Sequence, residues 1–129
     1  MLEELIARVF ATRNIVHVEH WNTTGEGSYA RHMALGDFYA AVIDKLDTIV
    51  EAHVGMFGPV KRLPKPQPYA PDDEDEDESD AIIDRLEDEM EWIEEYRDDL
   101  ARDISAIANM IDELAGVYLA AIYKLKRLM

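Results

Sequence analysis

All five prolines of the chain lie between residues 59 and 71, and this placement constrains the fold more than any other feature. Proline breaks helices and central strands, so residues 56–71 are expected to form an extended, semi-rigid crossing. On both sides of this crossing, apolar residues recur every three or four positions, and strand-like alternation is absent. The sequence therefore predicts an all-α fold.

The spacing predicts four helices. The first covers 2–21, and the second runs from the N-cap residue Ser28 to about Val54. The third begins at Ala81, with Ser79 as a candidate cap, and a break at 97–103, where aspartates offer caps, separates it from the fourth. Two short connections and one long crossover, residues 56–80, give a ferritin-like four-helix bundle in a single domain, residues 1–129.

The net charge of the chain limits which partners the protein can bind. The chain has 28 acidic and 13 basic residues and a net charge of −15, and residues 72–103 hold 18 of the acidic ones. Such a surface repels nucleic-acid phosphates and attracts cations. The acidic run at 72–80 is expected to be a solvated loop. The absence of cysteine excludes a disulfide scaffold and a cysteine nucleophile.

The start of the chain and its apolar runs indicate a soluble, cytoplasmic protein. No basic segment precedes the first apolar residues, and no apolar run approaches the roughly 18 residues that cross a bilayer.

Four residues are candidate metal ligands: His20, His32, Asp47 and Glu51. Imidazole nitrogens and carboxylate oxygens together suit iron and similar divalent metals. With His32 as zero and about 100° per residue, Asp47 falls near 60° and Glu51 near 100°, on one flank of the second helix. Taken singly, each histidine also fits a packed side chain, and the acidic pair also fits an ordinary charged surface.

Their context resembles a known family. The segments His20-Trp21-Asn22, His32 and Leu46-Asp47-Thr48-Ile49-x-Glu51 resemble the Dps family, the ferritin-like DNA-binding proteins from starved cells. In that family's pattern a second histidine follows the first by twelve residues, an aspartate follows fifteen residues later, and a glutamate four after that. The match is dense over roughly 17–58.

The resemblance implies a cage of twelve subunits with iron-oxidising sites at two-fold dimer interfaces. His20 and His32 would come from one subunit, and Asp47 and Glu51 from its partner. Such proteins oxidise Fe(II), preferably with hydrogen peroxide, and store ferric mineral. Trp21 would either intercept stray oxidising equivalents or anchor the interface.

The chain departs from the family at the second iron site. Many members have an aspartate where this chain has Gly36, although Asp37 and Asp44 fall on the Glu51 flank. The loss weakens the looser iron site and leaves binding of one iron open. His17, one turn before His20, either supplements the site or packs in the core.

The resemblance also bears on DNA binding and on the entry of iron. Members that compact DNA use a lysine-rich tail, and this chain has none before its first helix, so DNA binding is not expected despite the family name. Its remaining basic residues in the crossing and at the end are Lys61, Arg62, Lys65, Lys124, Lys126 and Arg127. Asp98, Asp99 and Asp103 lie where the family's pore aspartates, which admit Fe(II), would fall.

A second hypothesis is a ferritin-like shell or adaptor with a degraded metal site. Gly36, the short chain and the proline-rich crossing favour it, whereas the retention of all four ligands favours the enzyme. A weaker third idea is reversible buffering of divalent cations by the acidic surface.

Overall fold

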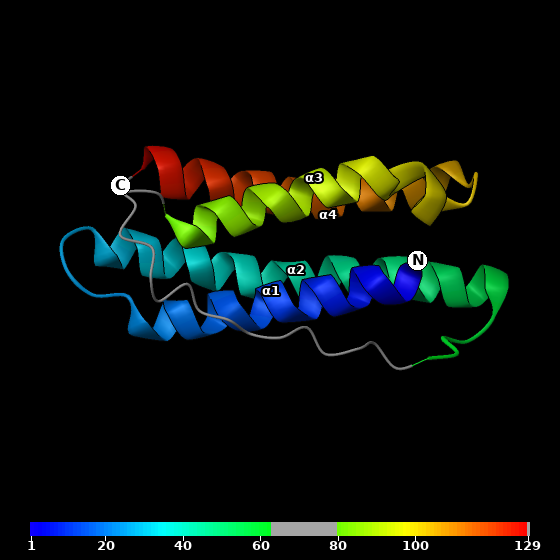
Figure 1. Ribbon diagram of the computed structural model, residues 1–129, viewed down its shortest axis with the longest axis horizontal. Helices are drawn as coiled ribbons and strands as arrows, with labels where there is room; N and C mark the ends of the chain where they lie inside the picture. The colour runs from blue at the N-terminus through cyan, green and yellow to red at the C-terminus, as the bar shows by residue number, and fades with distance from the viewer. Residues whose placement is uncertain (63–79, 129) are drawn as a thin grey trace.

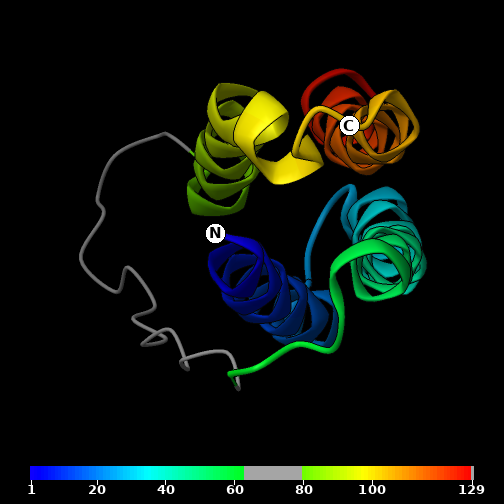
Figure 2. The same cartoon turned by 90° about the vertical axis from the view of Figure 1, so that its right-hand side faces the viewer.

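The computed structural model describes residues 1–62 and 80–128. Within these residues the chain forms four helices and no strand: α1 (Leu2–Asn22), α2 (Ser28–Phe57), α3 (Ala81–Ala101) and α4 (Ser105–Arg127). The helices lie side by side along one direction (Figure 1). Seen end-on, they occupy the corners of a square, with α1 beside α2 and α3 beside α4 (Figure 2). The predicted all-α four-helix bundle is confirmed.

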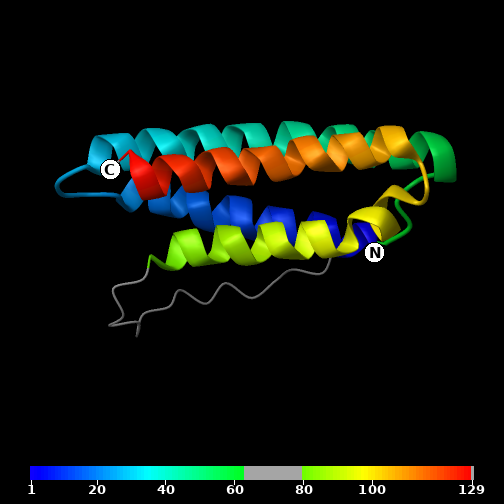
Figure 3. The same ribbon diagram turned by 90° about the horizontal axis from the view of Figure 1, so that it is seen from above.

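Two helical hairpins make up the bundle. The first reverses at residues 23–27, where Gly25 and Gly27 have φ angles of 97° and 76° that favour glycine. The second reverses at Arg102 and Asp103, whose φ angles of 51° and 65° are also positive. Helix α2 ends at the opposite end of the bundle from the start of α3, as Figures 1 and 3 show. The first hairpin therefore ends far from where the second begins.

Several helix ends differ from the sequence prediction. Helix α2 continues through Gly55 to Phe57, so the connection begins at Gly58 rather than at 56. Its N-cap residue is Gly27 rather than Ser28. Helix α4 has Ile104 at its N-cap with no side-chain hydrogen bond, so the expected aspartate cap is wrong. The left-handed conformation of the two preceding residues reverses the chain instead.

The start of α3 is capped by Asp80, whose Oδ1 accepts hydrogen bonds from the amides of Ile82 and Ile83 at 3.0 and 3.4 Å. The candidate cap Ser79 lies outside the described residues, as does most of the crossover, including the acidic residues 72–79. Only the two ends of the predicted crossover lie within the described residues.

The core is formed by apolar side chains from all four helices. Tyr118 of α4 is the largest fully buried side chain, and its ring meets the edge of Phe38 from α2 at 5.0 Å between centroids. Burial of these faces supplies the main force that holds the helices together. Other fully buried members are Leu5 and Val9 of α1, Leu35 and Ile49 of α2, Leu86 and Ile93 of α3, and Ile107 and Ile111 of α4.

Helix α4 is long and apolar enough to cross a membrane by length and composition, which corrects the expectation that no segment is. In the bundle, however, 44% of its most apolar window is buried against the other helices. A core helix of this length passes the same test, so α4 does not indicate a membrane location.

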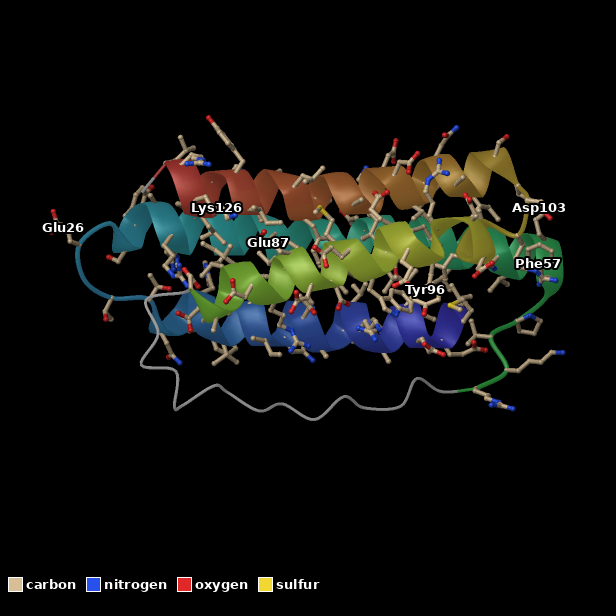
Figure 4. The ribbon with its side chains drawn as sticks, turned by 45° about the horizontal axis from the view of Figure 1, so that its top comes forward. Glu26, Phe57, Glu87, Tyr96, Asp103 and Lys126 are labelled. Atoms are coloured by element: carbon tan, nitrogen blue, oxygen red, sulfur yellow. The ribbon has the colours of Figure 1, made fainter. Side chains whose placement is uncertain are left out.

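Ion pairs join helices both within the second hairpin and between the two hairpins. Glu87 of α3 and Lys126 of α4, both labelled in Figure 4, lie 3.0 Å apart. Between α2 and α4, Lys124 contacts Asp37 at 3.2 Å. These partly exposed pairs contribute little energy individually, but they define which helix faces meet.

Candidate metal centre

His20 and His32 face each other across the first hairpin. His20 lies in the last turns of α1 and His32 in the first turns of α2, and the glycine-containing reversal between them brings these turns together. Their imidazole rings are stacked, with 3.6 Å between centroids and 20° between planes. Two residues twelve positions apart thus form one compact pair.

Reciprocal hydrogen bonds define the protonation of both rings. Nδ1 of His20 lies 2.7 Å from the carbonyl oxygen of His32, and Nδ1 of His32 lies 2.8 Å from the carbonyl oxygen of His20. A carbonyl oxygen only accepts, so we assign the proton of each neutral ring to Nδ1. Nε2 then keeps its lone pair on both rings. Orientation of a histidine by a backbone carbonyl is the usual arrangement around metal-binding imidazoles.

The ring of His20 contacts the surface of α2 one turn after His32. A Cβ atom at Gly36 would lie 3.0 Å from Cε1 and 3.3 Å from Nδ1 of His20. The edge of the ring faces Tyr39, with 5.1 Å between centroids. The aspartate common at position 36 in the Dps family therefore has no room here beside His20 in this orientation.

His17 packs beside the pair rather than joining it. Its ring stacks on Tyr39 at 4.0 Å and contacts Trp21 at 4.2 Å, whereas 6.4 Å separates it from the ring of His20. Desolvation lowers the pKa of His17, and the positive charge of Arg13 lowers it further. The packed role of His17 fits these contacts better than a ligand role. Trp21 itself is 65% exposed.

Asp47 and Glu51 lie far from the histidine pair within one chain. Fifteen residues of continuous helix separate His32 from Asp47, a rise of about 22 Å. Both carboxylates are exposed on α2. Over residues 1–62 and 80–128, no three histidine or acidic side chains group closely enough to hold a metal ion. The histidine pair and the two carboxylates are therefore separate within one chain.

The other acidic candidates do not reach the histidine pair either. Asp37 pairs with Lys124, and Asp44 is exposed one turn before Thr48, whose hydroxyl donates to the Asp44 carbonyl oxygen at 3.1 Å. Asp103 lies at the reversal between α3 and α4, at the end of the bundle near Phe57, whereas Glu26 marks the hairpin end (Figure 4). The candidate pore aspartates and the histidine pair thus occupy opposite ends of the bundle.

Comparison with protein families identifies a match over residues 20–125 to DUF5856, a family of unknown function. The chain belongs to DUF5856. No curated protein matches the chain. No solved structure matches it. The DUF5856 match begins at His20 and includes all four candidate ligands, so the histidine pair and the acidic pair both belong to the DUF5856 region.

Sequence reasoning missed a charged cluster next to the pair in this DUF5856 domain. The guanidinium of Arg31, adjacent to His32, donates two hydrogen bonds to Asp80, one of them 3.2 Å long, and lies 3.5 Å from Glu19. The cluster joins the end of α1 and the starts of α2 and α3. The only signal in the sequence was the capping potential of Asp80 itself.

A buried polar layer about two turns further along the bundle was also missed. Glu89 of α3 is only 5% exposed, and one of its oxygens lies 3.6 Å from Arg8, while the other has no hydrogen-bond partner among the described residues. Burial raises the pKa of Glu89, and Arg8 and Arg85 only partly oppose this. Burial, aided by the charge of Glu89, raises the pKa of Tyr118 well above its ordinary value.

Proposed function

We propose that this protein is a mini-ferritin that oxidises Fe(II) with hydrogen peroxide or oxygen and stores the ferric product, which protects its host against oxidative damage. The observation that carries the proposal is the reciprocal bonding of His20 and His32, which leaves an acceptor nitrogen on each of two adjacent rings. Neutral imidazoles combined with carboxylates are a donor set that suits iron. The spacing shared with the Dps family supports the same assignment.

The carboxylates of the centre come from a second copy of the chain. Asp47 and Glu51 lie about 22 Å and about 28 Å along the helix from His32, so they complete the site only if a partner packs antiparallel against α2. Large exposed side chains favour such packing: Phe10 and Trp21 share a stripe of α1 and are 46% and 65% exposed. We infer a homo-oligomer built from two-fold dimers, and a cage of twelve subunits by the Dps resemblance.

The arrangement of the hairpins is compatible with a ferritin-like topology. Helix α2 ends at one end of the bundle and α3 begins at the other, so the connection between them has to span the bundle length. One long crossover between the second and third helices is the ferritin-like arrangement. The proline content of this segment suits an extended crossing.

The proposed reaction consumes both reagents of hydroxyl-radical chemistry. Each Fe(II) gives up one electron, and two such electrons with two protons reduce one hydrogen peroxide to two waters. In the neutral rings the proton lies on Nδ1, so each Nε2 offers its lone pair to Fe(II). Trp21 either captures oxidising equivalents that escape or anchors the interface.

Electrostatics support iron uptake rather than DNA binding. The net charge of −15 attracts Fe(II) and opposes a polyanion. Asp98, Asp99 and Asp103 cluster at one end of the bundle, where they would guide cations through a pore. We place the protein in the cytoplasm, in line with its lack of cysteine.

The alternative function is a ferritin-like shell that no longer oxidises iron. One observation favours it: Gly36 stands where the Dps resemblance implies an aspartate, and among the described residues no acidic side chains group with His20 and His32. The alternative predicts normal assembly without catalysis.

The deciding experiment measures Fe(II) oxidation by hydrogen peroxide in the natural protein, His20→Ala and Asp47→Ala. We expect both substitutions to abolish fast oxidation, whereas the control Asp88→Ala, an exposed aspartate on α3, keeps it. Equal slow rates in all four proteins, with assembly unchanged, would favour the shell.

A mixing experiment tests whether the site is shared. We expect His20→Ala and Asp47→Ala, each inactive alone, to regain part of the activity when unfolded together and reassembled, because mixed dimers contain one site with all four ligands. No recovery in assemblies shown to be mixed would refute sharing between copies.

A further inference from the structure

We propose that Gly36 is a positioning residue for His20: its lack of a side chain lets the His20 ring lie against α2, and this geometry commits each histidine pair to a single metal ion. The inference rests on the proposed function for its metal, but its steric part concerns the metal-free protein. It also accounts for the position at which the chain departs from the Dps pattern.

The close contact at Gly36 is tighter than ordinary packing. Carbon atoms in good van der Waals contact lie about 3.5–4.0 Å apart. A Cβ at position 36 would lie 3.0 Å from Cε1 of His20, so alanine there would require the ring to move by several tenths of an ångström. Among the described residues, no other helical glycine has such a crowded Cβ position: an added Cβ at Gly55 or Gly116 would have no atom within 4 Å.

The His20 ring is not free to make that movement. Its Nδ1 donates to the His32 carbonyl at 2.7 Å, and its face stacks on the His32 ring at 3.6 Å. His32 and Gly36 are one turn apart on α2, so the ring spans these two positions. A side chain at position 36 would therefore push the His20 ring and strain its Nδ1 hydrogen bond to the His32 carbonyl. That hydrogen bond is the one that leaves the lone pair of His20 on Nε2.

The same contact limits the number of ions. A carboxylate from position 36 would need the space that the His20 ring occupies, and the nearest alternative, Asp37, contacts Lys124 on α4 instead. Among the described residues, no carboxylate of the same chain joins the pair to hold a second ion. We expect a borderline divalent ion such as Fe(II), Co(II) or Zn(II).

The test compares Gly36→Ala with Gly55→Ala, a matched substitution on the same helix. Titration with Co(II), followed by its visible absorption, is expected to give one strong site per chain in the natural protein and in Gly55→Ala. Gly36→Ala should bind about ten- to a hundredfold more weakly, the range seen when the partner that orients a metal-binding histidine is lost. Gly36→Asp should not add a second strong site.

Metal-free protein supplies the second measurement. Long-range ¹H–¹⁵N spectra of the imidazoles are expected to show a protonated Nδ1 on both His20 and His32, and to lose the His20 signal pattern in Gly36→Ala only. Thermal unfolding supplies a double-mutant cycle. In the His20→Ala background, Gly36→Ala should raise the Tm by about 3–5 °C, as Gly→Ala does at uncrowded helix positions. When His20 is present, the same substitution should raise the Tm less, or lower it.

The outcomes separate the two proposals. Absence of Co(II) binding in the natural protein refutes the metal site, while the imidazole spectra and the thermal cycle still decide the role of Gly36. Equal Co(II) affinity, unchanged imidazole spectra and equal stabilisation in both backgrounds overturn the positioning role and leave the proposed function standing. A second strong site in the natural protein refutes the commitment to one ion.

Discussion

Asp80 combines two stabilising roles that substitutions can separate. Its carboxylate caps α3 through the amides of Ile82 and Ile83, and it also receives two N–H groups from Arg31 of α2. The side chains of Arg31 and Asp80 are only 18% and 28% exposed, so solvent screens their attraction less than that of a surface pair. Asp80→Ala removes both roles, whereas Asp80→Ser keeps a capping oxygen and removes the ion pair.

The expected losses follow from these contacts. Loss of an N-cap costs about 1 kcal/mol, and hydrogen bonds between charged groups contribute about 1.5–3 kcal/mol before the remaining solvent contact is discounted. We expect Asp80→Ala to lower the free energy of unfolding by about 2–3 kcal/mol, and Asp80→Ser or Arg31→Met by about 1–2 kcal/mol. Asp84→Ala, an exposed aspartate in the same first turn, is the control and should change little.

Acid should reduce the difference in unfolding free energy between the natural protein and the Asp80 variants. Burial raises the pKa of Asp80, but the hydrogen bonds and charge of Arg31 and the two amides outweigh it, so the pKa is lowered on folding. The stabilisation is therefore present above the unfolded pKa, about 3.9, and is lost as the pH falls through the lower folded pKa. Urea unfolding followed by circular dichroism at pH 7 and at pH 2–3 measures this. Equal stability of Asp80→Ala and Asp80→Ser at pH 7 would refute the reasoning, and so would a difference between the natural protein and Asp80→Ala that is the same at both pH values.

Three further predictions concern other charges. Burial raises the pKa of Glu89, so native stability should fall as the pH rises through that pKa; Glu89→Gln should stabilise by about 1 kcal/mol at pH 8 and by less at pH 5, in thermal melts. Arg97 pairs with Asp112 at 2.6 Å on the surface, so Asp112→Asn should lower the Tm only slightly, and 1 M salt should remove the difference. Saturable retention of a DNA duplex in a low-salt gel shift would contradict the expected absence of DNA binding.

Helix positions and most helix ends were predictable from the sequence, but the end of α2 and the cap of α4 were not. The apolar spacing located all four helices because burial of one face decides the secondary structure. The sequence predicts capping aspartates at the reversal between α3 and α4, yet Arg102 and Asp103 adopt left-handed conformations there, for which only the aspartate has a modest preference. Adjacent Ser79 and Asp80 are both good caps, and the sequence does not reveal that Arg31, 49 residues away, bonds to Asp80.

The candidate site was predictable in its composition but not in its geometry. The spacing of His20 and His32 identified the pair, whereas their exchange of hydrogen bonds depends on how two helices meet. Glu89 was overlooked among many acidic residues, although it follows Leu86 by three positions and precedes Ile93 by four, on the core stripe of α3. Spacing, rather than residue type, was the signal that could have found it.

The division into two hairpins has a consequence for how this protein can change through evolution. All four proposed ligands lie on α1 and α2, while residues 72–103 of the chain hold most of its acidic residues. Substitutions on the outer faces of α3 can thus alter solubility and ion attraction without touching a ligand. In the proposed shared site the first hairpin has less freedom, because a change near either its histidines or its carboxylates would alter a centre built from two subunits.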